Sequence, residues 1–188
     1  MPDGRLVVVR AQGRERINGG VHQIQQSSLE LLDLGRGTQR TILKRTHWAG
    51  DIEAPAISAD GHTIVYAHAN SWLTAPAGGA SLYTVRIDGS ANRRITPWRL
   101  GGGDHPTFSP GGGILFRSYE YQETPHSQFM TVEPDGTGLR QLTHFPDGTM
   151  VLSASYSGDG DGLCTPAEGP AGTRACTGCA QTASAAAR

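Results

Sequence analysis

The chain repeats a short pattern at intervals of about 50 residues, and this repetition limits its possible folds more than any other feature. Residues 55–66 read as proline, any residue, an apolar residue, serine, a turn and an apolar run, and the same order returns at residues 106–116. Weaker copies lie at residues 2–9 and 155–160. A motif that recurs at a fixed distance is typical of stacked, nearly identical structural units.

A second repeated unit lies between these copies. Residues 82–96 match residues 129–143, and residues 29–43 are a degenerate first copy. Each unit has two short runs that contain β-branched residues, and in both clear copies an Asp-Gly pair joins the runs. Asp-Gly pairs favour the positive φ of tight hairpin turns, so each unit is predicted to be a hairpin. Two hairpins per repeat predict four short antiparallel strands, which is the composition of one β-propeller blade.

Composition agrees with an all-β fold. The 26 glycines and 11 prolines favour turns, whereas 18% charged and 37% hydrophobic residues exclude a disordered polyelectrolyte. The net charge of −1 gives no electrostatic basis for binding nucleic acid. A β-sandwich also has many short strands, but nothing in that fold requires a motif to repeat at a fixed distance.

The two units together resemble the TolB-type β-propeller repeat, which also occurs in the propellers of prolyl-oligopeptidase-like serine peptidases. The resemblance rests on the Pro-x-apolar-Ser turn with its apolar strand and on an Asp-Gly-x-x-x-Arg-x-apolar-Thr hairpin, and it runs from Pro2 to about Gly160. Gly111 and Gly158 depart from the expected acidic and proline positions of the turn, and residues 11–28 form a long polar stretch between hairpins. The resemblance implies a non-catalytic scaffold of bacterial envelopes that binds a protein or peptide.

The order of the units predicts a propeller fragment of about three four-stranded blades, in which the chain begins at the second strand of a blade. The expected layout is a partial propeller over residues 1–160 and a flexible, low-complexity tail over residues 161–188. Its blades fall near residues 1–50, 51–103 and 104–148, with the start of another at 149–160. Uncovered faces on the end blades would permit self-association.

Polar and aromatic residues precede the predicted innermost strands. In a propeller these connections gather at one mouth of the central channel, so their side chains converge there. We therefore predict a partner-binding site at the channel mouth, formed by Trp48, Asp51, Glu53, Trp98, Asp104, His105 and Asp147. For the tryptophans the alternative is that they pack as core between blades.

The sequence predicts no catalytic site, metal site or cofactor. It has no Gly-x-Ser-x-Gly pentapeptide, which a serine hydrolase of the α/β type needs for its nucleophile. Cys164, Cys176 and Cys179 lack a fourth zinc ligand, and residues 158–162 lack the later oxygen ligands of a calcium loop. Two rival hypotheses stay open: a propeller separated from a prolyl-oligopeptidase-like peptidase, where it gates substrate access, and a lyase that holds a metal on His105.

Two further expectations concern the surface and the compartment. Arg93, Arg94 and Arg99 are predicted to form a solvated outer edge. The apolar run at residues 6–9 is too short for a signal-peptide core or a membrane span. The protein is therefore expected in the periplasm or outside the cell if the natural chain starts upstream, and in the cytoplasm otherwise.

Overall fold

The structure is a computed structural model that describes residues 5–17, 21–46, 50–69, 79–100, 104–120, 126–151, 154–156, 162–168 and 174–181. Its strands form four antiparallel sheets that follow one another along the chain. The first sheet contains β1 (Arg5–Ile17), β2 (Val21–Asp33) and β3 (Thr38–Thr46). The second contains β4 (Asp51–Ile57), β5 (Thr63–Ala69), β6 (Ala80–Arg86) and β7 (Arg93–Arg94).

A short 3₁₀ turn, η2 (Trp98–Leu100), leads from the second sheet to the third. The third sheet contains β8 (Asp104–Phe108), β9 (Ile114–Glu120), β10 (His126–Val132) and β11 (Arg140–Gln141). The fourth contains β12 (Met150–Val151), β13 (Ser155–Tyr156), β14 (Gly162–Glu168) and β15 (Arg174–Gln181).

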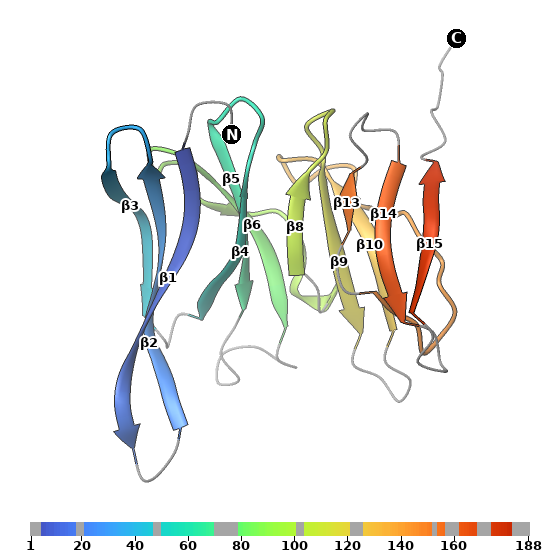
Figure 1. Cartoon of the computed structure of the whole chain (residues 1–188), viewed down its shortest axis with the longest axis horizontal. Helices are drawn as coiled ribbons and strands as arrows, with labels where there is room; N and C mark the ends of the chain where they lie inside the picture. Colours follow the sequence, from blue (N-terminus) through green and yellow to red (C-terminus); the bar gives the residue numbers. More distant parts are fainter. Residues whose placement is uncertain are drawn as a thin grey trace.

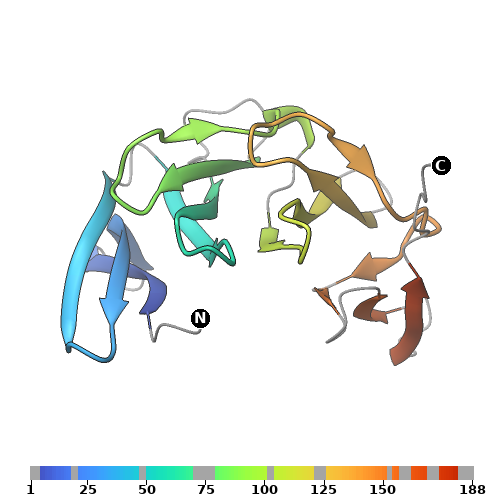
Figure 2. The ribbon, with the colours of Figure 1, turned by 90° about the horizontal axis from the view of Figure 1, so that it is seen from above.

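The four sheets stand side by side along the long axis of the molecule (Figure 1). Seen from above they fan along an arc, with β4 and β8 on its concave side and β6 and β10 on its convex side (Figure 2). Strand order within the second and third sheets runs from the innermost to the outermost strand as the repeats predict, β4-β5-β6-β7 and β8-β9-β10-β11. The prediction of an all-β propeller with four-stranded blades is confirmed.

The hydrophobic core lies between neighbouring sheets, because strands carry apolar side chains on both faces. In β5, Ile64 and Tyr66 pack toward the first sheet, whereas Val65 and Ala67 pack toward the third. This explains why the predicted strands are continuous apolar runs. The three successive interfaces contain Leu29, Ile52, Ile64, Tyr66 and Val85; then Val65, Ala67, Leu82, Ile95, Ile114, Phe116, Met130 and Val132; then Leu115, Phe129 and Val151.

The repeated Asp-Gly pair closes the outer hairpin of each complete sheet in the same way. Asp88 Oδ1 accepts hydrogen bonds from the backbone N–H of Ser90 at 2.9 Å and from its hydroxyl at 2.6 Å. Asp135 makes the same two bonds with Thr137, at 2.9 and 2.6 Å. The glycine that follows has a φ of 90° or 86°, a left-handed conformation that favours glycine. The pair therefore sets the turn through local bonds alone.

The repeated threonine ends the outermost strand. Thr96 Oγ1 accepts the backbone N–H of Leu82 at 2.8 Å, and Thr143 Oγ1 accepts that of Phe129 at 2.9 Å. In each case the hydroxyl continues the ladder beyond an outermost strand of only two residues. The strand can thus be short without leaving a buried donor on β6 or β10 unpaired.

The repeated arginine joins neighbouring sheets. Arg40 Nη2 donates to the carbonyl oxygen of Ile87 at 2.7 Å, and Arg93 Nη2 donates to that of Pro134 at 3.1 Å. Ile87 and Pro134 occupy the same place, directly before the Asp-Gly pair of the next hairpin. Arg93 is exposed, as the sequence predicts, but it also connects two blades.

The polar stretch at residues 11–28 continues β1 and β2 into a long hairpin. The two strands pair from Arg5 and Asp33 to Ile17 and Val21. The end of this hairpin projects beyond the other sheets at the lower left of Figure 1. We call residues 11–17 of β1 and 21–26 of β2 the hairpin arm.

Two strands lie within the predicted tail over residues 161–188. Residues 162–168 and 174–181 form β14 and β15, and β14 pairs with both β12 and β13. Strand pairing uses backbone N–H and C=O groups, which nearly every residue has, so a segment poor in large apolar side chains can still extend a sheet. β12 and β13 lie where the sequence predicts one further innermost strand, near residues 151–156.

The threonine contacts predict a stability difference. Thr96→Val should lower the free energy of unfolding by about 1–3 kcal/mol, because the buried N–H of Leu82 loses its acceptor while the side-chain volume stays the same. Thr96→Ser keeps the hydroxyl and should lose clearly less. Urea denaturation measures both variants, and equal losses would contradict the role of the hydroxyl.

The Asp-Gly turns predict a dependence of stability on pH. Hydrogen bonds from the Ser90 side chain and backbone lower the pKa of Asp88 below its ordinary value of 3.8, and Thr137 does the same for the pKa of Asp135. Because the folded pKa values are depressed, this stabilisation is complete above the ordinary pKa and is lost as the pH falls through the folded value. The melting temperature should fall on acidification, and the Ser90→Ala/Thr137→Ala variant should show a smaller fall below about pH 4. Identical pH profiles would reject this origin.

Candidate functional site

The innermost strands are anchored where they begin, at the predicted channel mouth. The backbone N–H of Ile52 on β4 donates to Ser27 Oγ on β2 at 3.0 Å. In the same way Val151 N–H on β12 donates to Ser127 Oγ on β10 at 2.9 Å. A hydroxyl on the third strand of one blade therefore holds the start of the next innermost strand. Arg117 on β9 adds a bond from Nη1 to the carbonyl oxygen of Val151 at 2.9 Å.

Strands β4 and β8 share a bulge a few residues after they begin. The register of β4 on β5 shifts between Glu53 and Ala56, and that of β8 on β9 shifts between Asp104 and Thr107. In both strands the residue before the proline has a left-handed φ, 42° at Ala54 and 49° at His105. A bulge changes the direction of the side chains next to it, and both bulges lie next to predicted mouth residues.

The structure places the acidic mouth residues on two neighbouring strands and one turn. Asp51 opens β4 and is half-buried, and Glu53 is exposed two residues later. Asp104 opens β8, where its backbone pairs with Arg117, and β8 is in contact with β4. His105 is exposed, and so is Asp147 in the turn before β12. Trp48 lies outside the described residues.

Trp98 packs against other side chains of the second sheet. Its ring lies edge-on to His68 at 5.5 Å between centroids and tilted to Tyr83 at 6.4 Å. The guanidinium of Arg94 lies 5.9 Å from the centre of the indole, and the side chain of Trp98 is half-buried. Trp98 thus combines a supported position with partial exposure, as an anchor for a partner requires.

The residues around Trp98 form a cluster that the sequence analysis did not identify. His68 is only 4% exposed and lies edge-on to Tyr83 at 5.1 Å, while Arg45 from the first sheet lies over the Tyr83 ring at 5.5 Å. We call these side chains the aromatic cluster: His68, Tyr83, Trp98, Arg45 and Arg94. The alternation within residues 64–68, which puts His68 on the same face as Ile64 and Tyr66, could have indicated its burial.

Tyr66 belongs to the same face and is held as a neutral hydrogen-bond donor. Burial raises the pKa of its phenol above the ordinary value of 10.0. The hydroxyl donates to Asn92 Oδ1 at 2.8 Å. The face of β5 toward the first sheet is therefore ordered by both packing and polar contacts.

Neither a metal-binding cluster nor a membrane-spanning helix is found in the part of the chain that the structure describes. These residues contain no group of three or more His, Cys, Asp or Glu side chains that could hold a metal ion. No helix among them is long and apolar enough to cross a membrane.

Four antiparallel sheets, fanned about a concave side lined by their innermost strands, define the class of this protein as a β-propeller. No protein-family model matches the sequence, and none of the curated proteins is significantly similar to it. Solved structures do match. TolB from Acinetobacter baumannii shares 21% identity with a TM-score of 0.57, over 79% of this chain and 33% of that one. A TolB candidate from Agrobacterium tumefaciens shares 26% identity with a TM-score of 0.54, over 72% and 48%.

An oligogalacturonate lyase in complex with manganese shares 19% identity with a TM-score of 0.57, over 80% of this chain and 42% of that one. The chain thus spans less than half the length of each of these proteins. In fold the chain is a β-propeller similar to these TolB structures, in agreement with the resemblance of its repeats.

The packing of His68 beside Gly50 predicts that a side chain at position 50 destabilises the fold. Gly50 is buried with a φ of 83°, and a Cβ there would collide with the carbonyl oxygen of Ala69 and the imidazole of His68. Gly50→Ala should lower the free energy of unfolding by about 1–3 kcal/mol beyond the cost of the backbone conformation. Gly37→Ala is the matched control, because Gly37 has a φ of 63° and no atom near its absent Cβ. Urea denaturation compares the two, and equal losses would show that the collision does not matter.

Proposed function

We propose that this protein is a non-catalytic β-propeller scaffold that binds a protein or peptide partner at its channel mouth. The observation that carries the proposal is the placement of Asp51, Glu53, Asp104 and His105 at the start of two neighbouring innermost strands, both rigidly paired to the strand behind them. Polar residues on a strand that is paired to its neighbour, Glu53 and His105 among them exposed, suit recognition of a partner, since little conformational entropy is lost on binding.

Charge suggests which partner segment the mouth accepts. Glu53 and Asp147 are exposed carboxylates, and Asp51 and Asp104 are acidic residues at the first positions of β4 and β8. A partner segment with lysine or arginine complements such a surface, and exposed ion pairs weaken as salt increases. Binding at the mouth should therefore be sensitive to ionic strength.

The hairpin arm supports the same site. Ser27 on β2 lies level with Ile52 at the start of β4, so the part of the hairpin before Ser27 extends past the mouth end of the innermost strands. In Figure 1 the arm and the lower ends of β4 and β9 lie on the same side of the molecule. A partner seated at the mouth would have the backbone of the arm beside it.

Gating of a peptidase is the second candidate function. An acylaminoacyl peptidase structure matches 85% of this chain and 26% of its own, at 10% identity and a TM-score of 0.52. In that role the mouth would admit peptides toward an attached catalytic domain instead of holding a partner. The two functions differ in residence time, since a gate needs weak contacts and a scaffold needs stable ones.

A peptide-display experiment tests the proposal. Random peptides displayed on phage are selected on the whole chain, and the affinity of the selected peptides is measured by calorimetry at two salt concentrations. We expect basic peptides whose affinity falls about tenfold with Glu53→Lys or with Asp104→Ala. Glu133→Ala, which removes an exposed carboxylate at the opposite end of the blade, is the control and should leave binding unchanged.

The outcomes separate the candidates. Selected peptides that bind Glu53→Lys and Asp104→Ala as tightly as the original chain would reject the channel mouth as the site. Binding at the mouth that dissociates within milliseconds for every selected sequence would favour gating over a stable scaffold.

A further inference from the structure

Three cavities with shared lining residues lie at the end of the blades opposite the channel mouth, along the second and third sheets. The first, of about 350 Å³, is on the concave, channel side of the arc and is lined by Ile57, Thr107 and Phe108 of the innermost strands and by Tyr156 of β13 among others. It shares Phe108, Ser109 and Pro110 with the second, of about 320 Å³. The third, of about 370 Å³, shares Thr63 and Pro134 with the second. Shared walls make the three cavities one radial furrow, which runs outward from the channel.

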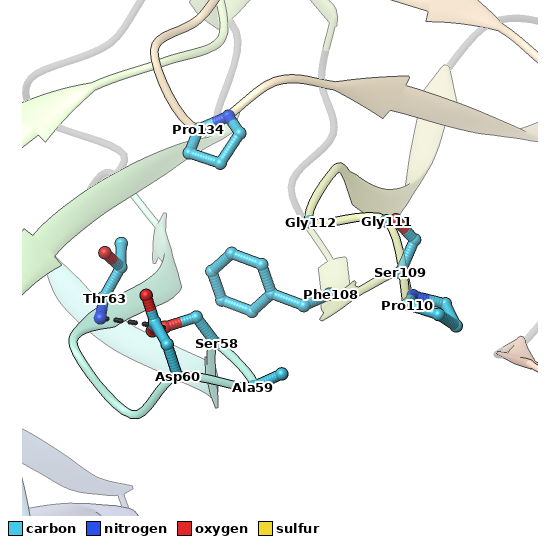
Figure 3. A pocket seen from close by; sticks show the side chains of 10 residues that line it. All are labelled: Ser58, Ala59, Asp60, Thr63, Phe108, Ser109, Pro110, Gly111, Gly112 and Pro134. Carbon is cyan, nitrogen blue, oxygen red and sulfur yellow. Dashed lines mark hydrogen bonds between the residues drawn. The ribbon is translucent and has the colours of Figure 1, made fainter.

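The middle of the furrow is bounded by two turns and a proline. Figure 3 shows the Phe108 ring between Pro134 on one side and Ser58 and Asp60 on the other. Pro110 lies on the side of Phe108 that faces away from Ser58 and Asp60. The β4–β5 and β8–β9 turns that supply these residues directly follow the innermost strands, whereas the mouth residues begin them. The furrow and the channel mouth are thus separated by the full length of β4 and β8.

The walls of the furrow are held by hydrogen bonds within the protein. Ser58 Oγ donates to Asp60 Oδ1 and accepts the backbone N–H of Thr63 at 2.9 Å. The carbonyl oxygen of Pro134 accepts the guanidinium of Arg93 at 3.1 Å. A furrow with fixed walls pays little ordering entropy when a ligand binds.

The chemistry of the furrow changes along its length. The channel end presents Phe108, Pro110 and Tyr156, which offer flat apolar surfaces. The outer end presents the exposed cations Arg86 and Arg93. A guanidinium has five N–H donors in a planar fork that matches a carboxylate, so Arg93 can bond to Pro134 and still receive an anion.

Asp60 in the middle excludes a polyanion. Hydrogen bonds from the Ser58 hydroxyl and the backbone N–H of His62 lower the pKa of Asp60 below its ordinary value, so it is ionised at neutral pH. A nucleic acid or an acidic polysaccharide would bring negative charge to this position, whereas a peptide can bring an amide N–H.

We propose that the furrow binds an extended peptide segment, with a proline or aliphatic side chain on Phe108 at the channel end and a carboxylate between Arg86 and Arg93 at the outer end. This site is distinct from the channel mouth, prefers acidic instead of basic peptides, and does not depend on the function proposed there. Proline and aliphatic side chains suit Phe108 because they pack on an aromatic face, and the carboxylate fixes the direction of the chain.

To test the furrow, random heptapeptides displayed on phage are selected on the whole chain carrying Glu53→Ala. This substitution weakens peptide binding at the channel mouth. Sequences that also bind Arg86→Glu are removed by counter-selection. We expect enriched peptides with proline or an aliphatic residue followed by an acidic residue. Their dissociation constants, measured by fluorescence anisotropy, should rise about tenfold with Arg86→Glu and with Phe108→Leu, which keeps an apolar side chain but removes the ring.

Matched controls separate the furrow from general charge and from the mouth. Arg140 is exposed at the position of the third sheet that corresponds to Arg93, but it does not line the furrow, so Arg140→Glu should leave the affinity unchanged. Glu53→Lys should also leave it unchanged, whereas it weakens peptides bound at the mouth. The proposal is overturned if no sequence survives counter-selection, if the survivors lack an acidic residue, or if Phe108→Leu binds them with the original affinity.

Discussion

Packing between neighbouring sheets is the interaction on which the rest of this structure depends. Each sheet is too small and too apolar on both faces to be stable alone, since Ile64 and Val65 are adjacent in one strand yet lie fully buried on opposite sides of it. The second and third sheets are therefore covered on both faces by their neighbours, and the fan of sheets is the arrangement that covers them. The innermost strands are consequently brought together on one concave side, where any site in the channel must form.

The polar part of the repeat serves this packing. Aspartate shapes the outer hairpin, threonine ends the short outermost strand, and arginine reaches the next hairpin, as in the Arg40 to Ile87 and Arg93 to Pro134 bonds. Each residue satisfies a backbone group that the packing would otherwise leave unpaired or loosely held. The spacing of aspartate, arginine and threonine in the motif therefore matches the three places in a blade where these hydrogen bonds form.

Opposite ends of the same strands carry opposite chemistry. Acidic residues stand at the first positions of β4 and β8, whereas Arg86 and Arg93 line the outer end of the furrow. The two peptide sites that we propose therefore differ in charge although the chain is nearly neutral, because the strands hold the two ends apart. The resemblance to TolB structures concerns the fold, and both sites are inferred from this chain's own residues.

The amino-acid sequence by itself determined the strands, the hairpins and their grouping into blades, because alternation, Asp-Gly turns and the repeated Pro-x-apolar-Ser motif act over a few residues. It also located the residues that lead into the innermost strands. It did not reveal the burial of His68 against Trp98, the strands β14 and β15, or the furrow whose successive cavities are lined by Ser58 and Phe108 and then by Arg93. Only the tertiary structure decided these three features. Each of them forms where backbone or side chains from separate strands or blades come into contact, and no local sequence pattern encodes such a contact.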